Sequence, residues 1–250
     1  MKTNILRSAV VLLFLCAAVN VQALVVFSDN FENVPAVTWP DATQDADPFA
    51  QIGTWSVTET LQQDIQVSNN AVPGAASGTN FLSVFRTNAT DVKATFAQSL
   101  NDTSKLVTVD FDLFFSNLCP TGEGANTALR TGTALNTLDV FMFTQNAGFR
   151  YVSNGVYLAP TQYFAHNQWH HVNITADMAT DKYSVTIGAV TYANLALKTA
   201  TDQLDYWWLS GNSVNSYFFL DNVVVASVPE PCTILILSIG GLLMKLRKKN

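Results

Sequence analysis

The chain has 250 residues, of which 48% are hydrophobic and only 13% are charged, and its formal net charge is −6 at pH 7. All 19 acidic residues but only seven of the 13 Lys and Arg residues lie between positions 24 and 231, so this body carries a formal charge of −12. So acidic a surface repels phosphate backbones, which argues against nucleic acid as a partner. About 200 residues are ample for one hydrophobic core, and we expect a single domain over residues 24–227.

Residues 1–23 have the pattern of a secretory signal peptide. Lys2 and Arg7 precede an uncharged apolar run, and small residues stand before a cleavage site after Ala23. We therefore expect an exported protein. Once this segment is removed, the body keeps Cys119 as its single cysteine, so no disulfide can form within it.

The first half of the body is predicted to consist of short strands separated by turns. The β-rich stretch 24–32 is expected to lie at a sheet edge or beside the last strand, and a loop rich in proline and acidic residues follows it. Further short strands are predicted at residues 52–57, 65–67 and 81–85. No window shows a sustained helical period, so an all-β body is indicated.

A longer strand is predicted at residues 107–115, where apolar residues occupy every second position. Asp110 and Asp112 share one face of this strand, and the opposite, apolar face should lie on the core. Residues 119–137 are rich in Gly, Thr, Ala and Asn and nearly lack bulky apolar residues. We expect them to form a long mobile loop, and loops of this length often carry binding sites.

The second half of the body contains seven further strand-like stretches: residues 138–143, 149–152, 156–158, 168–176, 183–187, 206–209 and 217–226. Asn154 and Gly155 favour a tight hairpin turn, because both tolerate positive φ. A second hairpin is expected to turn near residues 179–182. The stretch 217–226 is apolar on both faces except at Asp221 and Asn222, as expected of a central buried strand.

Short strands with turns roughly every 8 to 12 residues predict a two-sheet antiparallel jelly-roll β-sandwich. The stretch 168–175 (QWHHVNIT), followed by the hairpin strand 183–187 (YSVTI), resembles the Trp-His-His-Val strand pair of concanavalin A-like lectin/glucanase and laminin-G jelly rolls. The stretch 219–225 (FLDNVVV) is similar to their last strand, and residues 29–32 (DNFE) carry the resemblance in the first half. The resemblance implies their sandwich fold, which hosts lectins, hydrolases and inert adhesive modules, so it implies little about function.

The body lacks the residue patterns of a catalytic site. Glycosidases of this fold that resemble laminarinases carry Glu-x-Asp-x-Glu on one strand, since retaining chemistry needs carboxyl groups about 5 to 5.5 Å apart. None of Glu32, Glu59 and Glu123 is followed by a carboxylate two or four residues later. An exposed strand face explains Asp110 and Asp112 more simply than catalysis does. There is also no nucleophile elbow, zinc-protease motif or phosphate loop, so we expect that the protein is not an enzyme.

Three histidines, His166, His170 and His171, lie within six residues. His170 and His171 are adjacent in a predicted strand. Their side chains should therefore point to opposite faces, and they cannot share a metal ion without a bulge.

The resemblance to jelly-roll binding modules also implies a structural calcium site. Such modules often hold Ca²⁺ with oxygens from the first and last strands, and Asp29, Glu32 and Asp221 are the candidate ligands in this sequence. The alternative is that these carboxylates only hydrogen-bond the backbone at strand ends. No other cofactor is expected.

Exposed aromatic residues can stack on sugar rings. Tyr151 and Tyr157, beside the Asn-Gly turn, are the candidate saccharide platform, whereas Trp169 is expected in the core. Alternation also requires that Trp207 and Trp208 face opposite ways.

The last 23 residues, 228–250, have three parts. Val228-Pro229-Glu230-Pro231 is a stiff exposed spacer, because its prolines fix φ and remove backbone donors. The uncharged run 232–244 would span about 20 Å as a helix, short of the roughly 30 Å hydrocarbon core, so it is a marginal anchor. Four cations follow this run: Lys245, Arg247, Lys248 and Lys249. As a stop-transfer signal they should stay cytoplasmic, which puts the body on the far side of the membrane.

This order of proline spacer, short apolar helix and basic terminus resembles the PEP-CTERM sorting signal of Gram-negative bacteria, which a membrane-embedded exosortase recognises and processes. An ordinary tail anchor requires neither the spacer nor an export signal. The resemblance implies that the body is first periplasmic, anchored in the inner membrane, and is then sorted to the cell surface or extracellular matrix.

We expect a non-catalytic, lectin-like sandwich that contacts extracellular polysaccharide. Two alternatives stay open. One is a purely structural or adhesive coat protein without a saccharide site, and the other is a glycoside hydrolase.

Overall fold

The computed structural model describes residues 23–33, 51–52, 55–58, 63–69, 75–86, 95–102, 106–115, 123–130, 138–144, 149–158, 164–201, 204–211 and 216–228. The predicted signal peptide, apart from its last residue, lies outside these ranges, and so do the sorting and stop-transfer residues beyond Val228. Within the described ranges, no helix is long and apolar enough to cross a membrane.

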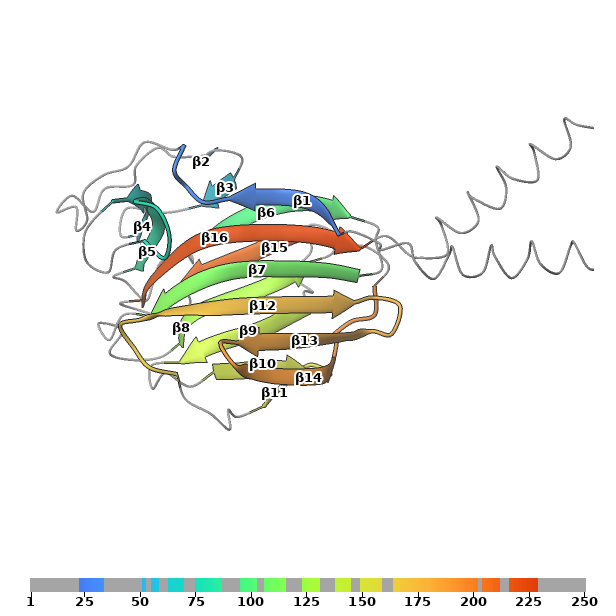
Figure 1. Ribbon diagram of the computed structural model, residues 1–250. Helices are drawn as coiled ribbons and strands as arrows, with labels where there is room; N and C mark the ends of the chain where they lie inside the picture. The colour runs from blue at the N-terminus through green and yellow to red at the C-terminus, as the bar shows by residue number, and fades with distance from the viewer. Residues whose placement is uncertain are drawn as a thin grey trace, which may run out of the picture.

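Every helix or strand assigned in these ranges is a β-strand, which confirms the predicted all-β class. In chain order they are β1 (Leu24–Asp29), β2 (Gln51–Ile52), β3 (Trp55–Thr58), β4 (Gln63–Ser68), β5 (Phe81–Arg86), β6 (Thr95–Asp102), β7 (Leu106–Phe115), β8 (Glu123–Arg130), β9 (Leu138–Thr144), β10 (Phe149–Ser153), β11 (Val156–Leu158), β12 (Trp169–Asp177), β13 (Lys182–Ile187), β14 (Val190–Ala196), β15 (Leu204–Gly211) and β16 (Ser216–Val228). They form two eight-stranded sheets (Figure 1). The first sheet has the order β14-β13-β12-β7-β16-β5-β4, with β1 also paired to β16, and the second has the order β11-β10-β9-β8-β15-β6-β3-β2.

The two sheets pack face to face around one main hydrophobic core (Figure 1). In β7, Phe111 and Leu113 have no exposed surface, while the alternating Asp110 and Asp112 are only partly buried. Trp207 of β15, in the second sheet, lies against Phe111, with ring centroids 5.2 Å apart. Full burial of such a side chain stabilises the fold by about 1.5–3 kcal/mol. The predicted two-sheet antiparallel sandwich is therefore confirmed.

The last strand, β16, is central, as its apolar faces predict. It pairs with β7 on one side and, on the other, with β5 along its first half and β1 along its second half. Leu24 of β1 is paired with Ser227, and Asp29 is paired with Val223. The first strand thus lies beside the last, as predicted, and the two ends of the body are neighbours.

Both predicted hairpins are confirmed. β10 and β11 are joined by Asn154 and Gly155, whose φ angles of 52° and 74° fit the primed turns that two-residue hairpins prefer. In the turn between β12 and β13, the Asp177 Oδ1 atom accepts the amide N–H groups of Ala179 and Thr180. Local turn chemistry therefore sets the register of both hairpins.

Residues 119–137 do not form the single long loop that their composition suggests. β8 runs through them and pairs with β9 and β15, because strand pairing uses backbone N–H and C=O groups, which small residues supply as well as large ones. The sequence reasoning also missed β6 and β14. It treated β2 and β3 as one strand, whereas Ile52 and Trp55 pair with each other as two antiparallel strands.

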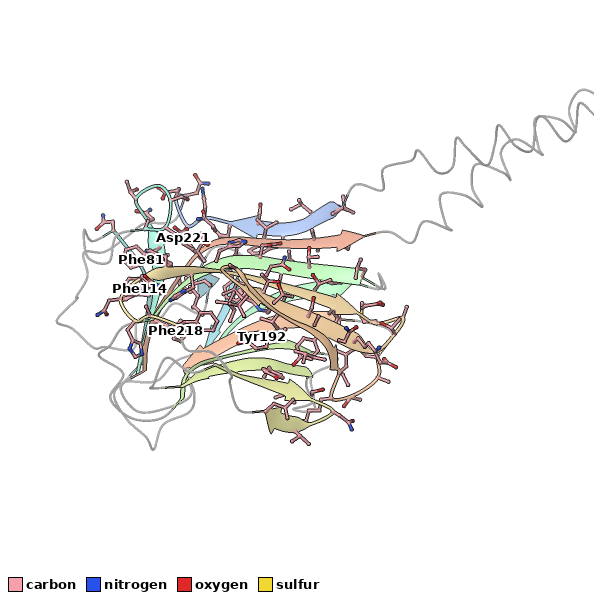
Figure 2. The ribbon with its side chains drawn as sticks, turned by 60° about the horizontal axis from the view of Figure 1, so that its bottom comes forward. Phe81, Phe114, Tyr192, Phe218 and Asp221 are labelled. Carbon is pink, nitrogen blue, oxygen red and sulfur yellow. The ribbon has the colours of Figure 1, made fainter. Side chains whose placement is uncertain are left out.

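Trp169 does not lie in the main core, contrary to the prediction. Its register partner is Phe114, and both lie on the side of the first sheet away from the core. There Trp169 packs against Phe81 and Phe114, with ring centroids 6.2 and 5.5 Å away, in a second small cluster with Phe219. Figure 2 labels Phe81 and Phe114 of this cluster. Strand alternation explains the position, since Val172 faces the core and Trp169 precedes it by three residues.

Candidate functional site

The first sheet carries a row of mostly polar side chains on the face that points away from the second sheet, which we call the outer face. Residues paired across neighbouring strands point to the same side of a sheet. The paired residues, from β1 through β16, β7, β12 and β13 to β14, are Ser28, Val224, Asp110, Asn173, Thr186 and Thr191. None of the six is buried. With strands about 4.8 Å apart, this outer-face row extends for roughly 24 Å.

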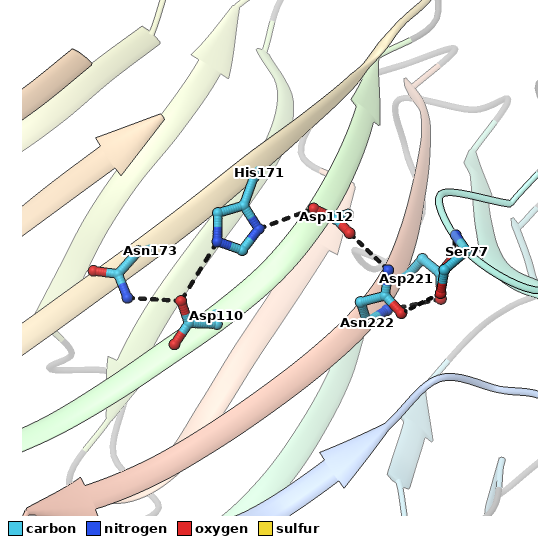
Figure 3. A network of polar contacts seen from close by, with 7 residues as sticks. All are labelled: Ser77, Asp110, Asp112, His171, Asn173, Asp221 and Asn222. Atoms are coloured by element: carbon cyan, nitrogen blue, oxygen red, sulfur yellow. Dashed lines mark hydrogen bonds and ion pairs between the residues drawn. The ribbon is translucent and has the colours of Figure 1, made fainter. Parts of the chain in front are cut away.

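His171 of β12 lies between two carboxylates of β7 on the outer face (Figure 3). Its Nδ1 atom is 3.0 Å from Asp112 Oδ1, and its Nε2 atom is 3.6 Å from Asp110 Oδ1. The Asn173 Nδ2 group donates a hydrogen bond to Asp110 Oδ1 at 2.8 Å. The imidazole is 59% exposed, against 18% for the Asp112 side chain. The histidine is therefore the group of this cluster that solvent or a ligand reaches first.

The structure confirms that Asp110 and Asp112 share a face, but sequence reasoning missed that His171 joins them. The contact follows from the register, in which His171 lies directly opposite Asp112. His170 is buried on the core side, with its Nε2 atom 2.7 Å from the carbonyl oxygen of Ala165. The adjacent histidines point to opposite faces, as predicted.

A β-bulge in β16 adds an amide to this network. The register of β16 on β7 shifts after Asp221, and Asn222 takes a φ angle of 51°. Asn222 Nδ2 donates to Asp112 Oδ2 at 2.7 Å, and Ser77 Oγ donates to Asn222 Oδ1 at 2.6 Å (Figure 3). The bulge thus connects the loop before β5 to the outer-face network.

The loop before β5, residues 75–80, is held from one side by Glu32. This carboxylate accepts hydrogen bonds from the Thr79 N–H, the Thr79 hydroxyl and the Asn80 N–H at 2.7–2.9 Å. These donors hold the pKa of Glu32 below its ordinary value, and the Asn80 N–H has the largest effect. Gly78 has a φ angle of +68°, and a Cβ atom there would overlap Glu32 Oε1, so the loop needs glycine at this position.

Asp221 holds the same loop from the other side and has no exposed surface. Its Oδ2 atom accepts the Ser77 N–H at 3.0 Å, and its Oδ1 atom accepts the Asn222 N–H at 2.7 Å. Burial raises the pKa of Asp221 to about 6, and the nearby Asp112 carboxylate raises it further. Backbone donors that include the Ser77 N–H lower the pKa but do not offset the effect of burial. The charge of this buried group therefore changes close to neutral pH.

The three candidate calcium ligands all accept backbone N–H groups. Besides Glu32 and Asp221, the Asp29 Oδ1 atom accepts the Phe31 N–H at 2.8 Å. Carboxylate oxygens suit calcium, but in the part of the chain that the structure describes no three or more His, Cys, Asp or Glu side chains are grouped to hold a metal ion. These hydrogen bonds are what we expect if the carboxylates only bind backbone groups at strand ends. The calcium site stays a prediction.

The candidate saccharide platform is only partly described. Tyr151 packs against the main core and lies beside Tyr192 of β14, with ring centroids 5.1 Å apart. In the register of β10 and β11, Tyr151 is opposite Leu158 and Tyr157 is opposite Val152, so the two tyrosines are not a cross-strand pair. A saccharide-binding role for them stays a prediction.

No protein-family model matches the sequence, and the search of curated proteins found no match. Among solved structures, a sialidase matches with 12% identity and a TM-score of 0.55, over 72% of this chain but only 18% of the sialidase. The T. cruzi calreticulin globular domain matches with 11% identity and a TM-score of 0.51, over 90% of this chain and 99% of that one. A protein of unknown function from Shewanella oneidensis matches with 10% identity and a TM-score of 0.50, over 72% of this chain and 81% of that one.

At such identities the likeness shows the fold alone. The class that this fold defines is a two-sheet antiparallel β-sandwich, which these solved structures share. Because the chain spans less than a fifth of the sialidase, that protein's activity does not carry over to it.

Proposed function

We propose that this chain is an exported, non-catalytic surface or extracellular-matrix protein whose lectin-like sandwich contacts extracellular polysaccharide. The observation that carries the proposal is the outer-face row, with the His171 cluster beside it. Together they present carboxylate, amide, imidazole and hydroxyl groups on five of the six strands that the row crosses, and on the sixth, β16, the row's member is Val224. Sugar hydroxyls both donate and accept hydrogen bonds, and these side chains offer both functions.

Hydrogen bonds along the row fix its side chains before any ligand arrives. The Thr186 and Thr191 hydroxyl oxygens are 3.0 Å apart, and the Thr175 hydroxyl donates to Asn173 Oδ1 at 3.2 Å. Asn173 in turn donates to Asp110. A surface ordered in advance loses less side-chain entropy on binding, which favours affinity for a long, weakly contacting ligand.

The carboxylates of this face favour binding over catalysis. Glycoside hydrolysis needs one protonated and one ionised carboxyl group on either side of the scissile bond. Asp110 and Asp112 already form hydrogen bonds with neighbouring side chains on the outer face. Asp221, whose pKa is raised, has no exposed surface from which to reach a glycosidic oxygen.

Export and sorting are proposed from the sequences of the two ends, residues 1–23 and 228–250. An exosortase is the proposed partner for Pro229-Glu230-Pro231, acting while the apolar run anchors the chain in the inner membrane and the body is periplasmic.

A glycan array tests the binding proposal, using the full-length chain purified in a detergent without a sugar head group. We expect binding to at least one extracellular polysaccharide. Asn173→Ala or Thr186→Ala should weaken it roughly two- to tenfold, because each removes a hydrogen bond worth about 0.5–1.5 kcal/mol. Thr199→Ala, exposed and outside the row, is the matched control.

Two other outcomes favour the alternatives. If no glycan binds, the chain is better described as a structural or adhesive coat protein. If incubation with polysaccharide releases reducing sugar, and a carboxylate variant stops the release, the chain is a glycoside hydrolase.

A further inference from the structure

An open pocket of about 370 Å³ lies where β1 ends beside the bulge of β16. Its polar lining consists of Ser28, Asp29, Asn30, Asn33 and Asn222. Val223 and Val224 complete the lining, and of these two only Val224 has appreciable exposed surface, since the Val223 side chain is buried in the main core. A small, concave, polar site of this kind differs from the flat outer face next to it.

The walls of the pocket are set by two backbone features. On one side, Asp29 accepts the Phe31 N–H, and Phe31 is fully buried with a φ angle of 59°, which fixes the turn after β1. On the other side, the bulge gives Asn222 its positive φ. Its amide is held there by Asp112 and Ser77. The pocket is therefore formed before a ligand binds.

The lining chemistry matches one neutral sugar. Amide groups donate and accept hydrogen bonds, and a carboxylate accepts two, which suits neighbouring hydroxyl groups on a ring. The partly exposed Val224 side chain suits the C–H face of the same ring. Among the lining residues that the structure describes are Asp29 and no Lys or Arg, so an acidic sugar would meet charge repulsion there without a described cation to offset it.

The pocket is also continuous with the outer-face row. Ser28 and Val224 belong to both, and Val224 is paired with Asp110 in the middle of the row. Asn222 links the pocket to Asp112. A polysaccharide lying along the row would therefore reach the pocket with one of its units.

We propose that this pocket binds one neutral sugar unit of the polysaccharide that lies along the outer-face row. The inference rests on the proposed function, because the row supplies the remainder of the site. It adds a specificity: neutral units are accepted and uronic acids are rejected at this position.

Saturation-transfer difference NMR on the full-length chain tests the pocket with glucose, galactose, mannose and glucuronate as free probes. Asn222→Gly removes an amide while keeping a residue that accepts positive φ, and Asn33→Ala removes an exposed amide. Each should weaken the neutral-hexose signal roughly fivefold, as expected for one lost hydrogen bond. Asp29→Asn keeps an acceptor for the Phe31 N–H but removes the charge, so it should raise the glucuronate signal roughly fivefold. Thr199→Ala should change neither signal.

The outcomes separate this inference from the proposed function. The proposal that the pocket binds a neutral sugar is wrong if no neutral hexose gives a signal. It is also wrong if the hexose signal is unchanged in both amide variants while polysaccharide still binds to the row. The charge selection is wrong if glucuronate binds the unaltered chain as well as glucose does. A third outcome is hexose binding that depends on Asn222 and Asn33 without any polysaccharide binding on the array. It would support the pocket as a neutral-sugar site and contradict the proposed function. Thermal melts of each variant confirm that it is folded.

Discussion

Asp221 is a buried carboxyl group whose environment disfavours its charge. Its pKa is raised from 3.8 to about 6, mainly by burial. Between these pH values the folded chain holds a proton that the unfolded chain has released. The group therefore contributes stability that is fully present below about pH 4 and is lost as the pH rises through 6.

We expect the free energy of unfolding to increase by about 1 kcal/mol from this group as the pH falls from about 7.5 to about 5, with the full effect reached only below about pH 4. Glu32, whose pKa is lowered from 4.5, stays ionised in the folded chain over this window, and it opposes the slope only slightly, near pH 5, where the unfolded chain begins to protonate it. Urea denaturation at several pH values measures the effect, and Asp221→Asn should remove most of the slope. Parallel pH profiles for the two proteins would show that another group is responsible.

Two glycines with similar backbone angles separate conformational strain from steric overlap. Gly78 and Gly188 have φ angles of +68° and +56°, but an added Cβ meets Glu32 Oε1 only at Gly78, and at Gly188 it meets nothing within 4 Å. We expect Gly188→Ala to cost about 1 kcal/mol through φ alone, and Gly78→Ala to cost at least about 1 kcal/mol more. Chemical denaturation of both variants measures the difference. Equal costs would mean that Glu32 moves aside freely.

At the scale of elements, β16 organises the first sheet. This 13-residue strand pairs with β7 along one side and with β5 and β1 along the other, and its bulge turns Asn222 toward Asp112. A bulge costs ladder hydrogen bonds, but it redirects side chains. The bulge contributes to both the outer-face network and the pocket.

The segment that follows β16 carries the sorting prediction. If Pro229, Glu230 and Pro231 form a recognition signal, replacing all three with Ala should leave the full-length protein in the inner membrane, because the apolar run and the cations that stop translocation remain. Cell fractionation and immunoblotting measure the distribution, with the unaltered chain as the control. Release of the Ala variant at the normal rate would contradict the sorting proposal.

At the scale of the whole molecule, carboxylates near the two ends of the body hydrogen-bond to the loop before β5. Glu32 follows the first strand and Asp221 lies within the last, and both bind that loop. Their contacts are hydrogen bonds to backbone and hydroxyl donors. The same ends could instead be joined by an ion through Asp29, Glu32 and Asp221.

Thermal melting distinguishes these two ways of joining the ends. The hydrogen bonds predict the same melting temperature in EDTA and in millimolar Ca²⁺. A shared ion at a hundredfold excess over Kd would add about 2.7 kcal/mol. For a domain of this size that stabilisation raises Tm by several degrees, and Asp221→Ala should abolish the rise. A calcium-dependent rise lost in that variant would establish the ion and replace the hydrogen-bonded account.

Local patterns in the sequence determined the class of fold and much of its detail. Alternation in residues 107–115 placed Asp110 and Asp112 on one face, and the same rule separated His170 from His171. The Asn-Gly pair determined one hairpin, because only a few residues accept its φ angles. These features depend on neighbours within a few residues, and the sequence contains that information.

Tertiary structure decided which strands became neighbours. Composition could not reveal β8, since its pairing with β9 and β15 depends on backbone groups of distant segments. The contact of His171 with Asp112, the outer position of Trp169 and the pocket at Asn222 all follow from register between strands far apart in the chain. Register is set by burying one face of each strand against the core, a condition met only when the whole sandwich assembles.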